Sequence, residues 1–131
     1  CMKTDQQEAN LTIKQRTRQI RTRDKPKGGI TLVNSASHKN QPALEGFVSS
    51  LKVKESISMG SSLKFCWIAE GIADLYPRFG PTCEWDIAAG HAILLAAGGD
   101  LRTSNGQKML YKKEKERYVN GNFVASGQPW P

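Results

Sequence analysis

Hydrophobic positions along the chain follow two different spacings, and together they predict strands and helices in alternation. Short apolar or alternating runs predict strands, at residues 29–35, 53–59, 72–77 and 123–126. Apolar residues three and four positions apart predict a helix at residues 40–51, and two apolar runs that are each followed by glycine predict helices at residues 62–70 and 85–97. This order is typical of a layered α/β domain with a mixed sheet covered by helices.

Capping and turn residues mark the ends of several of these elements. Asn40 is a candidate N-cap of the first helix, and Pro42 lies in its first turn. The glycine pair at 98–99 is placed to end the third helix. Residues 100–125 then predict short strands around the Ser104-Asn105-Gly106 turn.

The first 28 residues differ from the rest because they are strongly basic. Between Ile13 and Lys27 only Asp24 opposes the positive charges, which are Lys14, Arg16, Arg18, Arg21, Arg23, Lys25 and Lys27. Pro26 and the glycines at 28–29 predict a break after this segment. We therefore expect a basic edge strand or extended arm at 1–28 and the α/β domain at 29–131.

Composition narrows the class of protein. The chain has 131 residues, a formal net charge of +7 and a mean hydropathy of −0.51, which suits one globular domain. No window approaches the roughly 18 consecutive apolar residues of a membrane span. Residues 1–15 lack the apolar core of a signal peptide. The first residue is not Met, which suggests a truncated or trimmed product.

The three cysteines, Cys1, Cys66 and Cys83, lie far apart in the sequence. An odd number without a C-x-x-C pair indicates neither a disulfide framework nor a zinc site. Reduced thiols in a cytoplasmic protein are the simplest interpretation.

Asp86 is a candidate functional carboxylate at the start of the helix 85–97. Two interpretations remain open. A carboxylate in the first turn is ordinary capping chemistry, because it is favoured by the helix dipole. Alternatively Asp86 is one ligand of a Mg²⁺ ion, which takes one or two carboxylates together with substrate phosphate oxygens. Small residues along the helix would let neighbouring elements pack closely and fix Asp86 in place.

A second candidate site is the run Gly60-Ser61-Ser62-Leu63-Lys64 at the start of the helix 62–70. Backbone N–H groups and two hydroxyls would point outward there, with Lys64 on the same side of the first turn as Ser61. These groups would suit a phosphate. A serine N-cap beside a solvated lysine is the alternative.

Two cationic side chains follow predicted strands at the edge where α/β proteins bind ligands. His38 follows the strand 29–35, and Arg78 follows the strand 72–77. Either could pair with a phosphate, Arg78 in bidentate fashion, although a solvated surface position is the alternative for each. His91 does not share a helix face with Asp86 and is interpreted as packing, and Glu84 as a capping carboxylate.

The helix 85–97 carries the run Trp85-Asp86-Ile87-Ala88-Ala89-Gly90, followed by the run Ala96-Ala97-Gly98-Gly99. This pattern resembles the second signature of the inositol monophosphatase superfamily. The order of the GSSLK stretch, the YPRFGPT loop and the WDIAAGH helix resembles, more narrowly, the C-terminal half of bacterial CysQ-type 3′(2′),5′-bisphosphate nucleotidases. The resemblance is strong from about Ile30 to Leu101.

The resemblance implies a fold, an activity and a set of site residues. The fold would be the C-terminal half of the inositol monophosphatase-like (sugar phosphatase) fold. The activity would be Mg²⁺-dependent hydrolysis of adenosine 3′,5′-bisphosphate to AMP and phosphate, in sulfur assimilation and nucleotide recycling. By position, the resemblance makes Asp86 a catalytic Mg²⁺ ligand that also contacts substrate. By the same resemblance, the substrate-binding residues would be His38, Ser61, Lys64 and Arg78.

One departure from the family pattern limits what this chain is expected to do. The family's other metal ligands come from an upstream glutamate and a D-P-[IL]-D-G-T segment, which this sequence lacks. The chain therefore resembles only the C-terminal domain of an enzyme about twice as long. One aspartate cannot position a pair of metal ions, so we expect the chain alone to be inactive.

Two other classes of function remain. The same fold could serve another phosphate ester, such as an inositol phosphate, or residues 14–27 could bind nucleic acid. Because the basic segment lacks interleaved aromatic residues, we expect no nucleic-acid partner. The expected partners are a phosphorylated nucleotide, the missing N-terminal half, and further copies of the chain through the face that this half would cover. The expected location is cytoplasmic, with the inner face of the cell membrane as a peripheral site.

Overall fold

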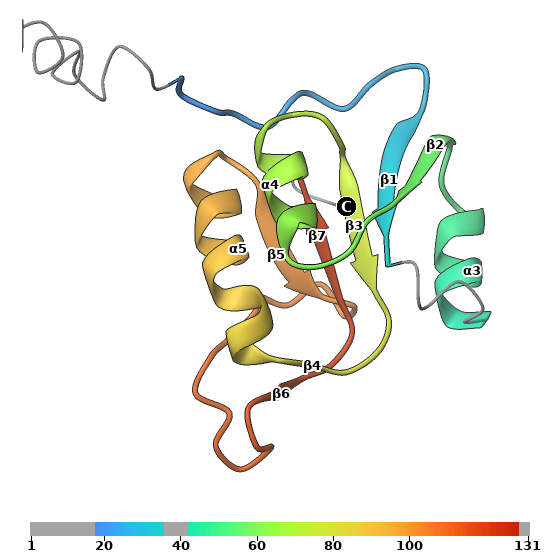
Figure 1. The fold of residues 1–131 in the computed structure, drawn as a ribbon. Helices are drawn as coiled ribbons and strands as arrows, with labels where there is room; N and C mark the ends of the chain where they lie inside the picture. Colours follow the sequence, from blue (N-terminus) through green and yellow to red (C-terminus); the bar gives the residue numbers. More distant parts are fainter. Residues whose placement is uncertain (1–17, 36–41, 129–131) are drawn as a thin grey trace, which may run out of the picture.

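The structure is a computed structural model that describes residues 18–35 and 42–128 (Figure 1). In chain order, its elements are β1 (Ile30–Asn34), α3 (Pro42–Ser49), β2 (Val53–Ser58), α4 (Leu63–Ala69), β3 (Leu75–Arg78), β4 (Thr82–Cys83), α5 (Glu84–Ala96), β5 (Asp100–Thr103), β6 (Val119–Asn120) and β7 (Phe123–Ser126). The predicted helix at 40–51 is therefore shorter, and its predicted cap, Asn40, lies outside the described residues.

The strands form a mixed five-stranded sheet in the order β2-β1-β3-β7-β5. β1 runs parallel to β2 and β3, whereas β7 runs antiparallel to both of its neighbours. β4 and β6 form a separate antiparallel pair just before α5. The prediction of a layered α/β domain with a mixed sheet is confirmed.

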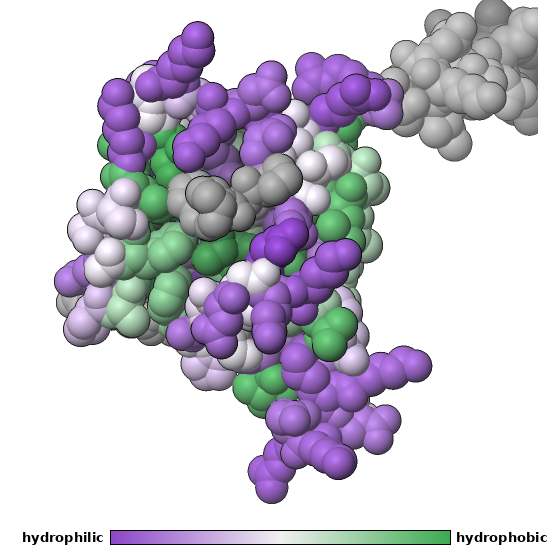
Figure 2. Space-filling view, turned by 180° about the vertical axis from the view of Figure 1, so that it is seen from behind, coloured by the Kyte–Doolittle hydropathy of each residue, from purple (hydrophilic) through white to green (hydrophobic). Residues whose placement is uncertain are grey.

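Alternation along the strands sends side chains to two separate apolar layers. On one face, Val33, Tyr76 and Phe123 pack with residues of α4 and α5. On the other face, Leu32 and Leu75 pack with partly buried residues of α3 and its neighbours. α3 itself buries no residue. Seen from behind, hydrophobic surface remains at the centre of the molecule and toward the side of α3 (Figure 2).

α5 and α4 approach each other closely because Gly90 has no side chain. A Cβ atom added at Gly90 would lie 2.6 Å from Cδ2 of Phe65 in α4. Phe65 is 1% exposed, and its ring packs against those of Tyr76 and Phe123, with centroids at 5.5 and 6.1 Å. This contact fixes how the two helices lie on the sheet.

The third predicted strand, 72–77, is displaced toward its C-terminal end. The chain reaches β3 only at Leu75, because Asp74 is occupied in a turn where its carboxylate accepts the N–H of Thr31 at 2.7 Å. Pro77 lies inside β3 and does not end it. β1 pairs with β3 only at Leu75, so no ladder N–H is needed at Pro77 on that side.

The described part of the basic segment, residues 18–28, contains no strand and lies as an extended arm against the domain. Arg23 donates from Nε and Nη2 to the two carboxylate oxygens of Asp74, at 2.7 and 2.6 Å. The backbone N–H of Thr22 donates to the carbonyl of Ala97 at 3.0 Å. Of the two predicted alternatives, the structure therefore shows an arm over these residues.

The outer face of α5 is apolar yet exposed. Ile93 and Leu95 are 42% and 50% exposed, and the alanines beside them at 88, 89, 92 and 96 are exposed as well. A helix that is apolar all round is normally covered by another element. No helix in the described part of the chain is long and apolar enough to cross a membrane.

The close approach of α4 and α5 predicts opposite effects for two glycine substitutions. Gly90→Ala should lower the free energy of unfolding by roughly 1–3 kcal/mol, because the added methyl group collides with Phe65. Gly46→Ala in α3 meets nothing within 4 Å and should raise that free energy by about 0.5–1 kcal/mol. Urea unfolding followed by circular dichroism measures both. A stabilising Gly90→Ala would contradict the packing described above.

Candidate functional site

A pocket of about 470 Å³ opens where β1 and β3 end and where α4 and α5 begin. Its lining residues are Ser35, Ser61, Ser62, Lys64, Phe65, Tyr76, Arg78, Thr82, Trp85, Asp86 and Ile87. The structure thus brings together four of the predicted site residues. A larger pocket of about 630 Å³ beside Lys25, Lys27 and Lys52 holds none of them. His38 lies outside the described residues.

Lys64 places a buried positive charge at this pocket. It is 3% exposed, and its Nζ donates to the carbonyls of Met59 at 3.1 Å and Ser61 at 2.7 Å. Burial, and then the positive charge of Arg78, lower the pKa of Lys64 below its usual value. An ammonium has three N–H donors. An anion in the pocket would accept from the third and offset both unfavourable effects.

Arg78 supplies a second cation with an unused donor. Its Nη1 donates to the hydroxyl of Ser35 at 3.3 Å and its Nη2 to the carbonyl of Pro81 at 3.3 Å. Its Nε is buried and has no hydrogen-bond partner among the described residues. A buried donor without an acceptor is costly, especially on a charged group. A phosphate or carboxylate oxygen in the pocket would remove that cost.

The serines before α4 contribute hydroxyls but only a short helix. Ser61 has a φ of +65°, which is unusual for a residue with a side chain, and Ser62 is the N-cap without a side-chain hydrogen bond to the helix. α4 has seven residues, so its dipole adds little to an anion site. The chemistry of the pocket therefore depends on Lys64 and Arg78. Lys64 is buried rather than solvated.

Asp86 is the acidic side chain of the pocket, and part of it is already used. Its Oδ2 accepts the backbone N–H of Cys83 at 2.7 Å, which caps the start of α5. The capping interpretation therefore holds for one carboxylate oxygen. No other hydrogen bond to the Asp86 carboxylate is found within 18–35 and 42–128.

The described residues alone do not form a magnesium site. The pocket offers one carboxylate, and residues 18–35 and 42–128 contain no group of three His, Cys, Asp or Glu side chains able to hold a metal. Mg²⁺ demands near-octahedral coordination and gives up its water reluctantly. Asp86 could serve as one ligand only in a site completed by other residues.

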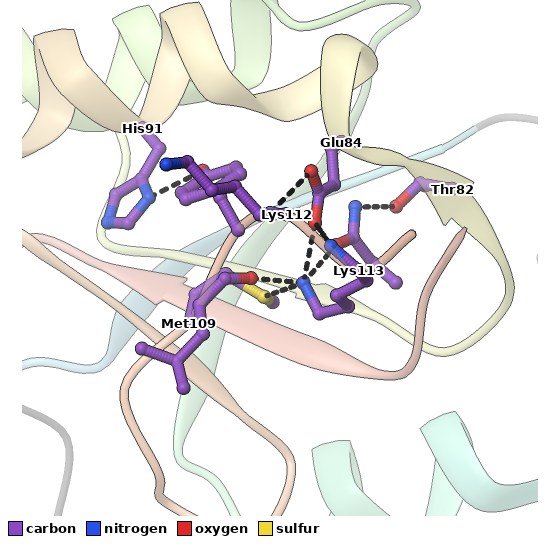
Figure 3. Close-up of polar contacts among 9 residues, drawn as sticks. Thr82, Glu84, His91, Met109, Lys112 and Lys113 are labelled. Carbon is purple, nitrogen blue, oxygen red and sulfur yellow. Dashed lines mark hydrogen bonds and ion pairs between the residues drawn. The ribbon is translucent and has the colours of Figure 1, made fainter. Parts of the chain in front are cut away.

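Glu84, interpreted from sequence as a capping carboxylate, has a different task. It is 9% exposed, and its carboxylate accepts the backbone N–H groups of Lys112 at 2.9 Å and Lys113 at 3.0 Å (Figure 3). Lys113 Nζ adds an ion pair with Glu84 at 3.3 Å and donates to Oδ1 of Asn120 at 3.0 Å. Asn120 in turn donates to the hydroxyl of Thr82. Glu84 therefore ties residues 109–118 to the start of α5.

His91 packs as expected and does not reach the pocket. It is 8% exposed, and its Nδ1 lies 2.7 Å from the hydroxyl of Tyr111 (Figure 3). Burial lowers the pKa of His91 and raises the pKa of Tyr111 to about 12. The imidazole is therefore neutral and the phenol protonated near neutral pH, and one hydrogen bond joins Nδ1 to the Tyr111 hydroxyl. This contact further holds the segment 109–118 against α5.

A pocket with two cationic side chains and one carboxylate lies at one edge of a mixed, helix-covered sheet, and this architecture defines a layered α/β domain. The sequence profile of the inositol monophosphatase family matches residues 4–128. This chain belongs to that family. The match runs across both the basic segment and the α/β domain.

Several relatives are bacterial 3′(2′),5′-bisphosphate nucleotidases called CysQ. The relative from Buchnera aphidicola is 48% identical over 96 residues, which are 72% of this chain and 36% of that protein. The relative from Escherichia coli K12 is 44% identical over 95 residues, 72% of this chain and 38% of that protein. The chain thus spans between a third and two fifths of these proteins.

Solved structures agree with this assignment. The crystal structure of CysQ from Bacteroides thetaiotaomicron has a TM-score of 0.67 and 41% identity, over 80% of this chain and 38% of that one. An inositol monophosphatase from Zymomonas mobilis has a TM-score of 0.66 at 20% identity, over 83% of this chain and 42% of that one. The second likeness concerns the fold alone.

The contacts of Glu84 with Lys112 and Lys113, which we call the Glu84 brace, predict that a Glu84 variant and the parent chain differ in stability by an amount that depends on pH. Burial alone would raise the pKa of Glu84, but the N–H donors and the Lys113 ammonium together lower it below the ordinary 4.5. Its stabilisation is therefore complete above pH 4.5 and is lost as the pH falls through the lower, folded pKa. Glu84→Gln should lower the melting temperature at neutral pH and lose this difference from the parent chain in acid.

A matched control for this prediction is Glu116→Gln, which removes a carboxylate from an exposed position of the same segment. It should change the melting temperature little at any pH. Thermal melts between pH 7 and pH 3 measure both variants. If Glu84→Gln and Glu116→Gln changed the melting temperature alike at every pH, the Glu84 brace would not stabilise the fold as described.

Proposed function

We propose that this chain is the C-terminal part of a 3′(2′),5′-bisphosphate nucleotidase that hydrolyses adenosine 3′,5′-bisphosphate to AMP and phosphate. Identity of 44–48% to nucleotidases called CysQ supports the substrate class. The observation that carries the proposal is the buried, unpartnered Nε of Arg78 beside the buried ammonium of Lys64. Two cations with donors to spare suit a ligand that carries more than one phosphate.

Each residue of the site has a proposed role. Lys64 and Arg78 bind phosphate oxygens, Lys64 as a point charge and Arg78 through its planar guanidinium. Ser61 lines the pocket and offers its hydroxyl to the same ligand. For His38 the proposal rests only on the resemblance, since the residue is outside the described part of the chain.

Asp86 is proposed as a catalytic residue that contributes one metal ligand. The family is one of metal-dependent phosphatases, and Mg²⁺ is the ion that we propose. Because the pocket has a single carboxylate, the remaining ligands would have to come from outside the described residues, and we propose that the N-terminal part of a longer protein supplies them. We expect the 131-residue chain alone to be catalytically inactive for that reason.

Hydrolysis of an inositol phosphate is the second candidate, supported by the family and by the fold of the Zymomonas mobilis enzyme. Arg78 favours the nucleotidase, because a monophosphate would not need a second cation with an unused donor. A nucleic-acid partner is not proposed, since Arg23 of the basic arm is occupied by Asp74.

The exposed apolar face of α5 supports two partner proposals. In a longer protein this face would pack against the N-terminal part, and in the isolated chain it would favour self-association. We further propose a cytoplasmic location. Peripheral association with the inner face of the membrane stays a prediction of the resemblance.

The role of Arg78 predicts a selective kinetic defect. In a chimera in which this chain replaces the matching segment of the Escherichia coli relative, Arg78→Ala should raise KM for adenosine 3′,5′-bisphosphate by about 10- to 100-fold. Lost hydrogen bonds to a charged group, at roughly 1.5–3 kcal/mol, give this range. KM for a substrate with one phosphate should rise far less. Equal increases for both substrates would contradict the assignment of Arg78 to a second phosphate.

The role of Asp86 predicts loss of activity without loss of the fold. Asp86→Asn in the same chimera should keep the circular dichroism spectrum, because asparagine also accepts the Cys83 N–H, yet remove most phosphate release. The 131-residue chain alone should release no phosphate and bind Mg²⁺ only weakly at millimolar concentrations. Release of phosphate from adenosine 3′,5′-bisphosphate, measured side by side, tests both. Robust turnover by the chain alone would overturn the division of the site between two parts.

A further inference from the structure

Tyr76 and Ser35 line the phosphate pocket, and the proposed function gives neither of them a role. Tyr76 lies two positions before Arg78 in β3, so both side chains point to the face of the sheet that α4 and α5 cover. Ser35 follows directly after β1, the strand beside β3. Each of these two side chains contacts one of the pocket's cations.

The ring of Tyr76 lies under the ammonium group of Lys64. The distance from Nζ to the ring centroid is 4.9 Å, within the roughly 6 Å at which an aromatic face attracts a cation. Both side chains are buried, and this attraction is stronger where water is excluded. The ring itself is fixed, because it packs edge-on against the rings of Phe65 and Phe123, with centroids at 5.5 and 5.6 Å. A fixed ring therefore defines where the ammonium lies.

Ser35 holds the other cation. Its hydroxyl accepts a hydrogen bond from Nη1 of Arg78 at 3.3 Å, and a second hydrogen bond joins Ser35 to the side chain of Tyr76. Burial raises the pKa of Tyr76 above its ordinary 10, whereas this hydrogen bond and the charge of Arg78 lower it by less. The phenol is therefore uncharged at neutral pH. One chain of contacts runs from the ammonium over the ring to the guanidinium.

The partners of both cations are electrically neutral. Within residues 18–35 and 42–128, Lys64 donates to two backbone carbonyls, and Arg78 donates to a hydroxyl and a backbone carbonyl. No ion pair of either cation is found in this part of the chain. A neutral partner fixes the direction of a cation without cancelling its charge. Both positive charges therefore remain available to an anion, although they repel each other.

We propose that Tyr76 and Ser35 are positioning residues for the two phosphate-binding cations. The ring of Tyr76 orients the Lys64 ammonium, and the hydroxyl of Ser35 orients the Arg78 guanidinium. The inference rests on the proposed function and deepens it, because it assigns the groups that hold two like charges side by side without an ion pair. Each positioning residue acts on phosphate through the cation that it holds.

The role of Ser35 is tested by titrating inorganic phosphate against the ¹⁵N-labelled 131-residue chain and following the Arg78 Nε–H resonance by NMR. Ser35→Ala should raise the Kd of phosphate about tenfold, because the guanidinium loses a hydrogen bond that fixes its direction. Ser35→Thr keeps the hydroxyl and should keep the parent affinity. Ser50→Ala is the matched control, since it removes an exposed hydroxyl that donates to the Phe47 carbonyl outside this pocket. Equal affinities of the parent chain and Ser35→Ala would overturn the role of Ser35.

The role of Tyr76 is tested by removing its ring and, separately, its hydroxyl. Tyr76→Leu should raise the Kd of phosphate about tenfold, and Tyr76→Phe, which keeps the ring, should raise it less. Tyr111→Leu is the control for lost packing, because it removes a partly buried ring beside His91. It should lower the melting temperature and leave the Kd unchanged. A Tyr76→Leu chain that is less stable but binds phosphate like the parent would show that Tyr76 only packs.

If Tyr76→Leu does not fold, the ε-CH₂ protons of Lys64 in the parent chain decide its role. A ring under the ammonium should shift these protons upfield, and Tyr76→Phe should preserve the shift. Their resonances are assigned by their loss in Lys64→Arg. Lys64 ε-CH₂ protons at ordinary positions would overturn the contact with the ring and, with it, the role of Tyr76.

Failure of the phosphate pocket would be recognised separately. Arg78→Ala should remove most of the phosphate binding whatever positions the guanidinium. Binding that Arg78→Ala weakens but that Ser35→Ala and Tyr76→Leu leave unchanged would overturn the positioning roles and leave the pocket intact. Binding that Arg78→Ala does not affect would contradict the proposed function. Absence of saturable phosphate binding by the parent chain would overturn both the pocket and the positioning residues.

Discussion

The contact of Gly90 with Phe65 determines where the functional groups of this domain lie. Without a side chain at Gly90, α5 packs directly on the Phe65 ring of α4, which itself packs against the rings of Tyr76 and Phe123. Both helices then begin at the same edge of the sheet. Lys64 from the first turn of α4 and Asp86 from the first turn of α5 therefore line one pocket. A bulkier residue at position 90 would separate them.

Two cationic side chains lie at that pocket. Burial, and then the positive charge of Arg78, lower the pKa of Lys64 there. Arg78 also keeps a buried Nε–H without an acceptor in the described chain. An anionic ligand whose oxygen atoms reached these donors would satisfy them and offset the repulsion, and for this reason we propose that phosphate binds here.

Local patterns in the sequence predicted the fold and indicated four residues that the structure brings to one pocket. The run from Trp85 to Ala97 and the glycine pair after it located α5 almost to the residue, and the segment GSSLK together with Arg78 indicated groups that lie at the same edge. What it could not predict depends on contacts between distant positions. From the sequence, Glu84 was interpreted as a helix-capping carboxylate, because its partners, Lys112 and Lys113, are 28 and 29 residues away along the chain. The displaced start of β3 likewise depends on Arg23 and Thr31 meeting Asp74.

The Arg78 Nε–H resonance reports most directly on whether this pocket binds phosphate. It is observed by ¹H–¹⁵N NMR on the 131-residue chain and assigned by its loss in Arg78→Lys. Because the donor is buried and lacks an acceptor among the described residues, inorganic phosphate should shift it saturably and slow its exchange with water. A resonance that stays unchanged while phosphate reaches millimolar concentrations would show that Arg78 does not bind the anion, and the proposed site would be wrong.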